Sequence, residues 1–201
     1  MDVVRSADSV CRLLTSQLDA DWGVPVPDLD FTVAGVVAHA ATAMLWYSVD
    51  LWSGAQDAAF EVTVAADAPN ERLLSSVVAG ARALAAGIDA AAPDRRGFHP
   101  FGSPDPEGFA AMACDELLVH GDDAARGLGT TLDPEPEVAA KVLNRLYPWH
   151  RVDGEPWQAL LWANGRIDLP GLPRQTRWRW HSAPLSEWDG TAAPESAGHG
   201  A

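Results

Sequence analysis

Three residues in this sequence have the types and spacing of a metal site: His39, Glu116 and His120. Glu116 and His120 stand four residues apart in a stretch with helical periodicity, which places two side chains on one helix face with Cβ atoms about 5–6 Å apart. Such a pair can converge on one divalent cation, and His39 would complete three ligands if its helix is a neighbour. Histidine and carboxylate ligands favour zinc, although nickel, iron or manganese would also be accepted.

Burial favours the metal interpretation. A carboxylate inside an apolar bundle is costly unless it is paired, and residues 32–52 contain no Lys or Arg that could pair with Glu116. A simpler alternative is also open. Glu116 and His120 would pair with each other on a solvated helix face, and His39 would be a core histidine bonded to a backbone carbonyl. Spacing by itself does not decide between the two.

Two further side chains are candidates for the surroundings of this site. Asp123 points roughly the same way as the preceding ligand histidine and could orient its ring from behind; the alternative is a solvated helix end that pairs with Arg126. Asp122 is expected to face solvent. Trp46 lies two turns after the first histidine on the same helix face, so we expect it to line a substrate pocket beside the metal.

The elements that must position these residues are helices. Apolar residues recur at helical spacing in four long stretches separated by Pro/Gly-rich breaks, which predicts a mainly all-α fold built on a four-helix bundle. Thr32 and Asn70 are predicted to cap the second and third helices, and Pro106 suits the first turn of the fourth. The long helices are predicted over residues 2–19, 32–52, 70–91 and 106–127, shorter helices over 134–147 and 156–163, and a lone strand over 176–182.

These elements divide the chain into three parts. We expect a metal-binding bundle over 1–130, a C-terminal helical extension that includes the strand and packs on the bundle over 131–189, and a disordered tail over 190–201, where the sequence is small and polar. Six of the nine Trp residues follow residue 148, and we expect them to pack this extension onto the bundle. A pocket for a flat apolar ligand is the alternative.

Composition restricts the partners. Lys and Arg number 14 against 28 Asp and Glu, and the net charge of -14 repels phosphate backbones and anionic lipid, so neither nucleic acid nor a membrane is an expected partner. No apolar run approaches the roughly 20 residues of a membrane span, and the N-terminus lacks a signal-peptide core, which predicts a cytoplasmic protein. Cys11 and Cys114 lie in apolar helical patterns and are expected to be reduced packing residues.

Three stretches resemble the mycothiol-dependent maleylpyruvate isomerase family, which belongs to the DinB-like superfamily of metal-binding four-helix bundles. They are PVPDLDFTVAGVVAHA (25–40), ELLVHGDDAARGLG (116–129) and LLWANGRIDLPG (160–171). The resemblance implies that His39, Glu116 and His120 are the metal ligands and that Asp123 fills the acidic position after the ligand histidine. The C-terminal sequence does not clearly match the isomerase's own C-terminal domain, from which the substrate anion would partly be held.

The resemblance also implies a function. Three protein ligands leave one metal position open, as in catalytic zinc sites, and in relatives this position would hold a low-molecular-weight thiol, mycothiol. We therefore expect an isomerase or thiol S-transferase that acts on a small electrophilic substrate with mycothiol as cosubstrate, as a monomer or homodimer. Two alternatives stay open: a non-catalytic bundle that binds a hydrophobic small molecule, and a metal-dependent hydrolase.

Overall fold

The computed structural model describes residues 2–150 and 153–191, and within them every regular element is a helix. Four long helices form a bundle: α1 (Val3–Thr15), α2 (Val33–Ser53), α3 (Asn70–Ala90) and α4 (Pro106–Gly127). Two shorter helices, α5 (Pro136–Leu146) and α6 (Pro156–Ala163), and a 3-10 turn, η1 (Leu185–Glu187), follow. The predicted all-α bundle is confirmed, and α2, α3 and α4 begin and end within one residue of the predicted positions.

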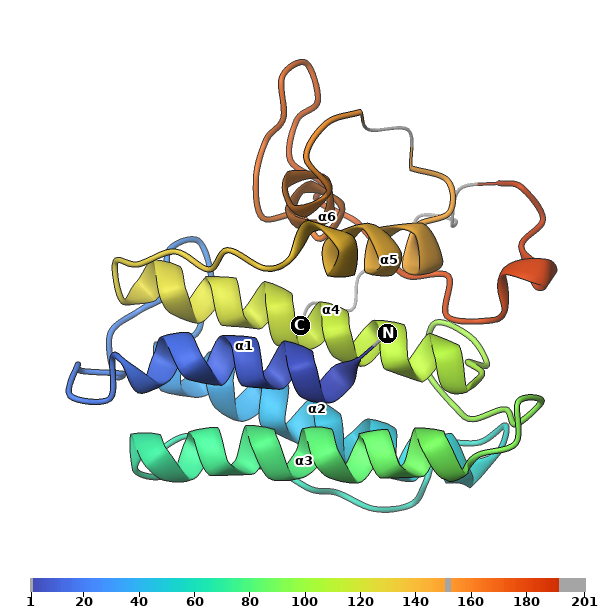
Figure 1. Cartoon of the computed structure of the whole chain (residues 1–201), viewed down its shortest axis with the longest axis horizontal. Coiled ribbons are helices and arrows are strands. Elements are labelled where there is room, and N and C mark those ends of the chain that lie inside the picture. Colours follow the sequence, from blue (N-terminus) through green and yellow to red (C-terminus); the bar gives the residue numbers. More distant parts are fainter. Residues whose placement is uncertain (1, 151–152, 192–201) are drawn as a thin grey trace.

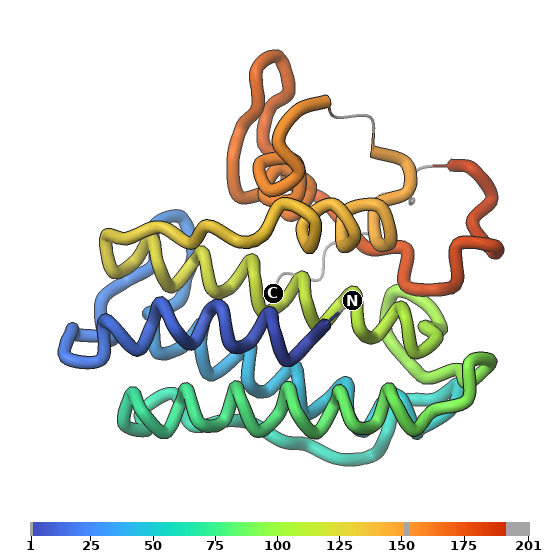
Figure 2. The backbone as a smooth tube through the Cα atoms, viewed as in Figure 1, coloured from blue at the N-terminus to red at the C-terminus, as the bar shows by residue number. Residues whose placement is uncertain are grey.

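The connection between α2 and α3 is unusual for a simple bundle. α1 and α4 run in one direction and α2 and α3 in the other, so residues 54–69 return along the length of the bundle before α3 begins (Figures 1 and 2). This crossover segment is fastened to α2 at two points. Trp46 Nε1 donates to the Val62 carbonyl at 3.0 Å, and the Val64 amide donates to the Thr42 hydroxyl at 2.9 Å.

Local capping begins two of the helices that carry the candidate site. The Thr32 hydroxyl accepts a bond of 3.1 Å from the amide three residues along, and the Asp105 carboxylate accepts one of 2.7 Å in the same way ahead of α4. Each bond satisfies an amide that has no partner inside its helix. The cap predicted at Asn70 is not formed, because its side chain instead donates to the Leu18 carbonyl at 3.0 Å and ties the start of α3 to the end of α1.

The core explains why α2 is apolar on nearly all sides. This helix packs against both α3 and α4, so it has no broad solvent face. α2 and α3 approach closely at Gly80, where a Cβ would lie 2.9 Å from that of Met44. Cys11 and Cys114 are buried free cysteines, as packing residues are, and burial raises the pKa of each thiol to about 11. The largest fully buried apolar side chains in the four long helices include Leu14, Met44, Leu51, Leu73, Leu84, Met112, Leu117 and Leu118.

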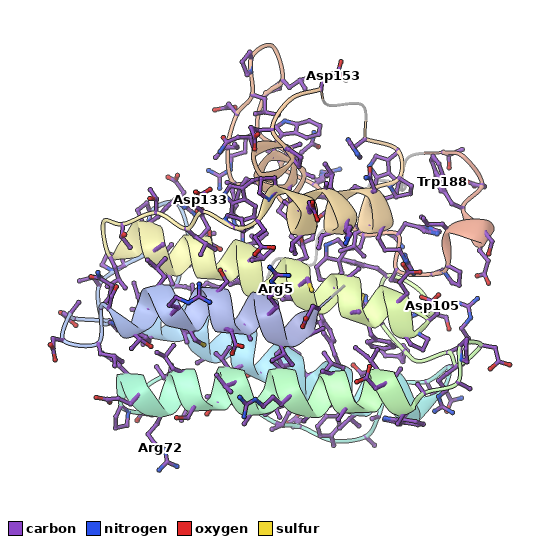
Figure 3. The ribbon with its side chains drawn as sticks, viewed as in Figure 1. Arg5, Arg72, Asp105, Asp133, Asp153 and Trp188 are labelled. Carbon is purple, nitrogen blue, oxygen red and sulfur yellow. The ribbon has the colours of Figure 1, made fainter. Side chains whose placement is uncertain are left out.

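The C-terminal extension packs on α4 through α5, on the side away from α3 (Figure 1). The prediction of a strand over 176–182 is wrong, since the described part of the chain contains no strand. The backbone of this segment bonds to the end of α5 instead. The His181 amide donates to the Leu146 carbonyl at 2.8 Å. The Arg145 guanidinium donates to the carbonyls of His181 and Ser182, each at 3.2 Å. Arg145 also bonds Asp105 at 2.7 Å, at the start of α4 (Figure 3).

The sequence predicts three parts of the chain: a bundle, a C-terminal extension and a tail. The extension does pack on the bundle, whereas a domain boundary near residue 130 stays a prediction. Most of the predicted tail, residues 192–201, lies outside the described residues.

Among the described helices, α3 has the length and composition of a membrane span, with a mean hydropathy of 1.4, contrary to the expectation that no apolar run approaches such a span. Core helices of soluble proteins meet the same criteria, and Leu73, Val77 and Leu84 are buried in the bundle. One such helix is weak evidence for a membrane.

Candidate metal centre

The bundle brings His39 of α2 together with Glu116 and His120 of α4. Glu116 Oε2 lies 3.0 Å from His120 Nε2 and 3.6 Å from His39 Nε2, and the two imidazole centroids are 4.8 Å apart. All three potential ligand atoms lie within 4.8 Å of one another. The predicted neighbourhood of α2 and α4 is therefore present, and the solvated alternative does not apply, because the Glu116 side chain is only 12% exposed.

Glu116 is held as a carboxylate. Burial would raise its pKa, but the adjacent imidazoles of His120 and His39 hold it well below its usual range. Oε1 accepts a hydrogen bond of 3.1 Å from the Tyr47 hydroxyl. Oε2 is buried and has no well-aligned hydrogen-bond partner among the described residues, although both imidazole nitrogens face it. A buried anionic oxygen that faces two imidazole nitrogens without an aligned hydrogen bond fits a site that a cation completes.

His120 is held between two acids. Its Nδ1 lies 3.1 Å from Asp123 Oδ2, on the opposite side of the ring from Glu116. Burial lowers the pKa of the imidazole, but Asp123 and Glu116 together raise it to about 9. A neutral ring that donates Nδ1–H to Asp123 presents the Nε2 lone pair toward Glu116, which is the tautomer that metal-binding histidines commonly use.

Asp123 is fixed from the C-terminal extension as well as from its own helix. Its fully buried carboxylate accepts hydrogen bonds from Arg166 Nη2 at 2.9 Å and from Arg166 Nε at 3.0 Å. It also accepts a hydrogen bond from Arg126 Nη2. Burial would raise the pKa of Asp123, but bonds to His120 and Arg166 keep it well below the usual range. The sequence left two interpretations of Asp123: an acid that orients the histidine ring, or a solvated helix end that pairs with Arg126. Contacts to both His120 and Arg126 are present, but Asp123 is buried and not solvated.

The expectation that Asp122 faces solvent is wrong. Asp122 is buried and bonds Arg126 Nε at 3.2 Å. The reason is that α1, α2 and α5 all pack on α4, which leaves this helix no broad solvent face. Burial is the largest influence on Asp122 and raises its pKa to about 6, since Arg126 compensates for it only in part.

Trp46 lines a cavity beside the three residues, as predicted from its spacing. Its ring stands edge-on to His39 at 6.4 Å between centroids and is 38% exposed. The cavity has a volume of about 500 Å³, and His39 and Glu116 form part of its wall. A binding role for Trp46 remains a prediction.

Several residues of this wall were missed in the sequence. Tyr47 is one apolar helix residue among many in the sequence, and His99 stands in a Pro/Gly-rich stretch, yet both line the cavity with Asp50. The His99 ring lies 5.9 Å from that of Tyr47, and burial, with the charge of Arg179, lowers its pKa to about 4, so the ring is neutral at pH 7. These residues come together only through the tertiary fold.

Five of the six tryptophans after residue 148 pack as expected, and Trp188 is not among the core residues. Trp157 and Trp180 are buried in the core, and Trp149, Trp162 and Trp178 pack against it. None of these five lines the cavity at the centre, which weighs against the apolar-ligand alternative that they suggested.

Comparison with known protein families finds a match for most of the bundle. A family model described as the mycothiol maleylpyruvate isomerase N-terminal domain matches residues 4–125, which include all three candidate ligands. The match covers more than half of the chain and ends before α5, so the stretch 160–171 lies outside it. No curated protein and no solved structure matches.

Proposed function

The chain belongs to the family of the mycothiol maleylpyruvate isomerase N-terminal domain, and we propose that it is a metal- and mycothiol-dependent enzyme, an isomerase or thiol S-transferase, acting on a small electrophile. His39, Glu116 and His120 would hold one divalent ion, for which zinc is the first choice and nickel, iron or manganese are acceptable. The enzyme would work in the cytoplasm as a monomer or homodimer, without nucleic acid or membrane as partner.

The observation that carries this proposal is the position of Glu116 Oε2. It is a buried anionic oxygen, and two imidazole nitrogens lie 3.0 and 3.6 Å away from it. One ion placed among the three would satisfy all of them together, whereas without it the carboxylate depends on protonated histidines. Three ligands from two helices leave coordination positions open toward the cavity.

When bound, the ion would lower the pKa of a coordinated thiol and so supply a thiolate at neutral pH. The protein's residues would position the reactants. Asp123 fixes the ring of His120, Tyr47 fixes Glu116 through Oε1, and Trp46 closes one wall of the cavity. Addition of the thiolate to an activated double bond, rotation and elimination would isomerise a substrate, whereas displacement of a leaving group would transfer the thiol.

Elemental analysis of the purified protein tests the metal directly. We expect about one divalent ion per chain, lost in Glu116→Gln and His120→Ala. Glu107→Gln is the matched control, because Glu107 is exposed in the first turn of the same helix and distant from the ligand pair in sequence. A natively folded protein that neither contains nor takes up a metal would defeat the proposal.

Turnover with a panel of electrophiles, with and without mycothiol, tests the reaction. Thiol-dependent conversion that is lost in the metal-free variants supports the proposal. Metal-dependent conversion that needs no thiol would instead assign a hydrolase. Ligand binding that survives chelation and His39→Ala, with no turnover, would assign a non-catalytic binding protein.

A further inference from the structure

The cavity beside the metal centre has a wall of one charge sign. Its charged lining residues are Asp50, Asp57, Glu61 and Glu116, and no Lys or Arg is among the residues that line it. Asp50 lies near the end of α2, while Asp57 and Glu61 belong to the crossover segment 54–69. Because that segment is fastened to α2 through Val62 and Val64, it places these acids against the same space as the ligands.

Three of these acids lack a cationic partner. Within residues 2–150 and 153–191, Asp50, Asp57 and Glu61 make no ion pair, whereas the buried Asp123 bonds an arginine. Asp50 is a buried residue, and burial first, then the charge of Asp57, raises its pKa to about 6. The two carboxylates therefore repel each other across a partly desolvated space, and a cation between them would relieve that repulsion.

Two arginines that are close to this wall, Arg95 in sequence and Arg179 through its charge on His99, are engaged elsewhere. Arg95 donates to the Leu51 carbonyl and stacks on the Trp52 ring at 5.2 Å. Arg179, whose charge lowers the pKa of His99, donates to a loop carbonyl at 3.2 Å and lies over the ring of Phe101. Neither lines the cavity, so a carboxylate substrate would meet no cationic side chain there.

The remainder of the wall is aromatic. Trp46, Tyr47, Phe60 and Phe98 line it together with the His99 ring. Aromatic faces attract cations through their quadrupole, most strongly where water is partly excluded. Carboxylates and aromatic rings around one space are the usual recognition chemistry for ammonium groups on an apolar body.

We propose that this cavity binds an organic cation, a small molecule that joins an ammonium group to an apolar body, and that Asp50 and Asp57 determine this specificity. The proposal rests on the proposed function, because the bound molecule would be the electrophile that meets the thiolate. It separates this chain from an enzyme for a carboxylate anion such as maleylpyruvate, since the wall would repel such a substrate.

Calorimetric titration with three matched probes tests the proposal independently of turnover. The probes are benzyltrimethylammonium, neutral benzyl alcohol and anionic phenylacetate, each titrated into the protein as purified with its metal. We expect the cation to bind about tenfold or more tightly than the neutral probe, since opposite charges in contact near a protein surface supply at least that factor. Phenylacetate should bind more weakly than the cation, even though its carboxylate can reach an open position of the metal.

Two variants connect the preference to the named acids. Asp50→Asn and Asp57→Asn should each weaken cation binding about fivefold to tenfold and leave the neutral probe unchanged. Asp133→Asn is the matched control, because it removes the same charge from an exposed residue between α4 and α5 (Figure 3). Asp57 is itself exposed, so its variant should fold even if Asp50→Asn does not, and circular dichroism checks both.

Three results would overturn the proposal. Phenylacetate could bind as tightly as the cation, Asp133→Asn could weaken cation binding as much as Asp50→Asn does, or a second metal ion per chain could be found that depends on Asp50. The outcome is separable from the proposed function. A protein without metal that still prefers the cation through Asp50 would defeat the reaction but keep this inference, and a metal- and thiol-dependent enzyme without that preference would do the reverse.

Discussion

Replacing Asp123 by Asn tests how the candidate centre is held in place. Asp123 is fully buried and has three cationic or donor neighbours: Arg166, Arg126 and the Nδ1 of His120. The substitution keeps the shape of the side chain and removes its charge. It therefore leaves a buried guanidinium without its carboxylate, and the imidazole of the candidate ligand His120 without the acid at its Nδ1.

The magnitude follows from these contacts. Removing one partner of a buried ion pair destabilises a protein by about 3–5 kcal/mol. We expect the lower end, about 3 kcal/mol, because Arg126 is partly exposed and can turn to solvent. For a chain of this size that corresponds to a fall in Tm of about 6–12 °C. Loss of the carboxylate behind a ligand histidine should also weaken metal binding about 10–100-fold.

Asp122→Asn is the control next to it in sequence. This substitution removes the same charge from α4. Asp122 shares the contact with Arg126, but no contact joins it to His120. Because burial raises its pKa from 3.8 to about 6, loss of its charge should stabilise the protein by about 1–2 kcal/mol at pH 7.5, which is opposite in sign to the effect of Asp123→Asn. Urea unfolding of the metal-free protein and competition with a chromophoric chelator measure the two effects separately.

Two outcomes would refute this reasoning. If Asp123→Asn loses stability but keeps the metal affinity of the unmodified protein, Asp123 anchors Arg166 and does not position His120. If both Asn variants lose the same affinity, the cause is the general negative field of this end of α4, and the contact at 3.1 Å between His120 and Asp123 has no special part in it.

Two further predictions concern Asp50 and Gly108. The folded pKa of Asp50 is raised to about 6 from 3.8, so the unmodified protein should lose stability relative to Asp50→Asn as the pH rises between those values. In urea unfolding the variant should be about 1–2 kcal/mol more stable at pH 7.5 and equal at pH 4, and a constant difference would contradict the assignment. At Gly108 a Cβ would lie 2.4 Å from the Ser182 carbonyl oxygen. Gly108→Ala should therefore destabilise the protein by about 1–3 kcal/mol and displace the backbone at Ser182, whose carbonyl accepts from Arg145. An unchanged midpoint of urea unfolding would contradict this prediction.

The parts of this structure that the sequence predicted correctly are set by local signals. Thr32 caps α2 with its hydroxyl, and Pro106 stands at the first residue of α4, so both helices begin where short-range chemistry requires. The pair Glu116 and His120 faces the histidine of α2 because helical spacing fixes their common direction. Any neighbour packed on that apolar side of α4 would meet both side chains.

The parts that were missed depend on distant contacts. Arg166 reaches Asp123 across 43 residues, and nothing in its local sequence indicates that partner. The segment over 176–182 alternates as a strand does, but the end of α5 offers it a single backbone carbonyl and the Arg145 side chain, so no ladder forms. The crossover 54–69 has little periodicity, and its place over the cavity follows from the parallel course of α2 and α3 (Figure 2).

The buried acids of α4 show why a metal is the cation to expect at Glu116. Asp115 accepts from Asn164 and Trp180, and burial, then the charge of Glu116, raises its pKa to about 7. Asp123 has Arg166. Both therefore receive partners from the extension, on the side of α4 where polar donors are available. Glu116 faces α2, whose residues 33–53 include no Lys or Arg, so the fold supplies it with imidazoles and one hydroxyl only. Because this helix satisfies its other buried acids with protein donors but not this one, a cation from solution is the partner that we propose for Glu116.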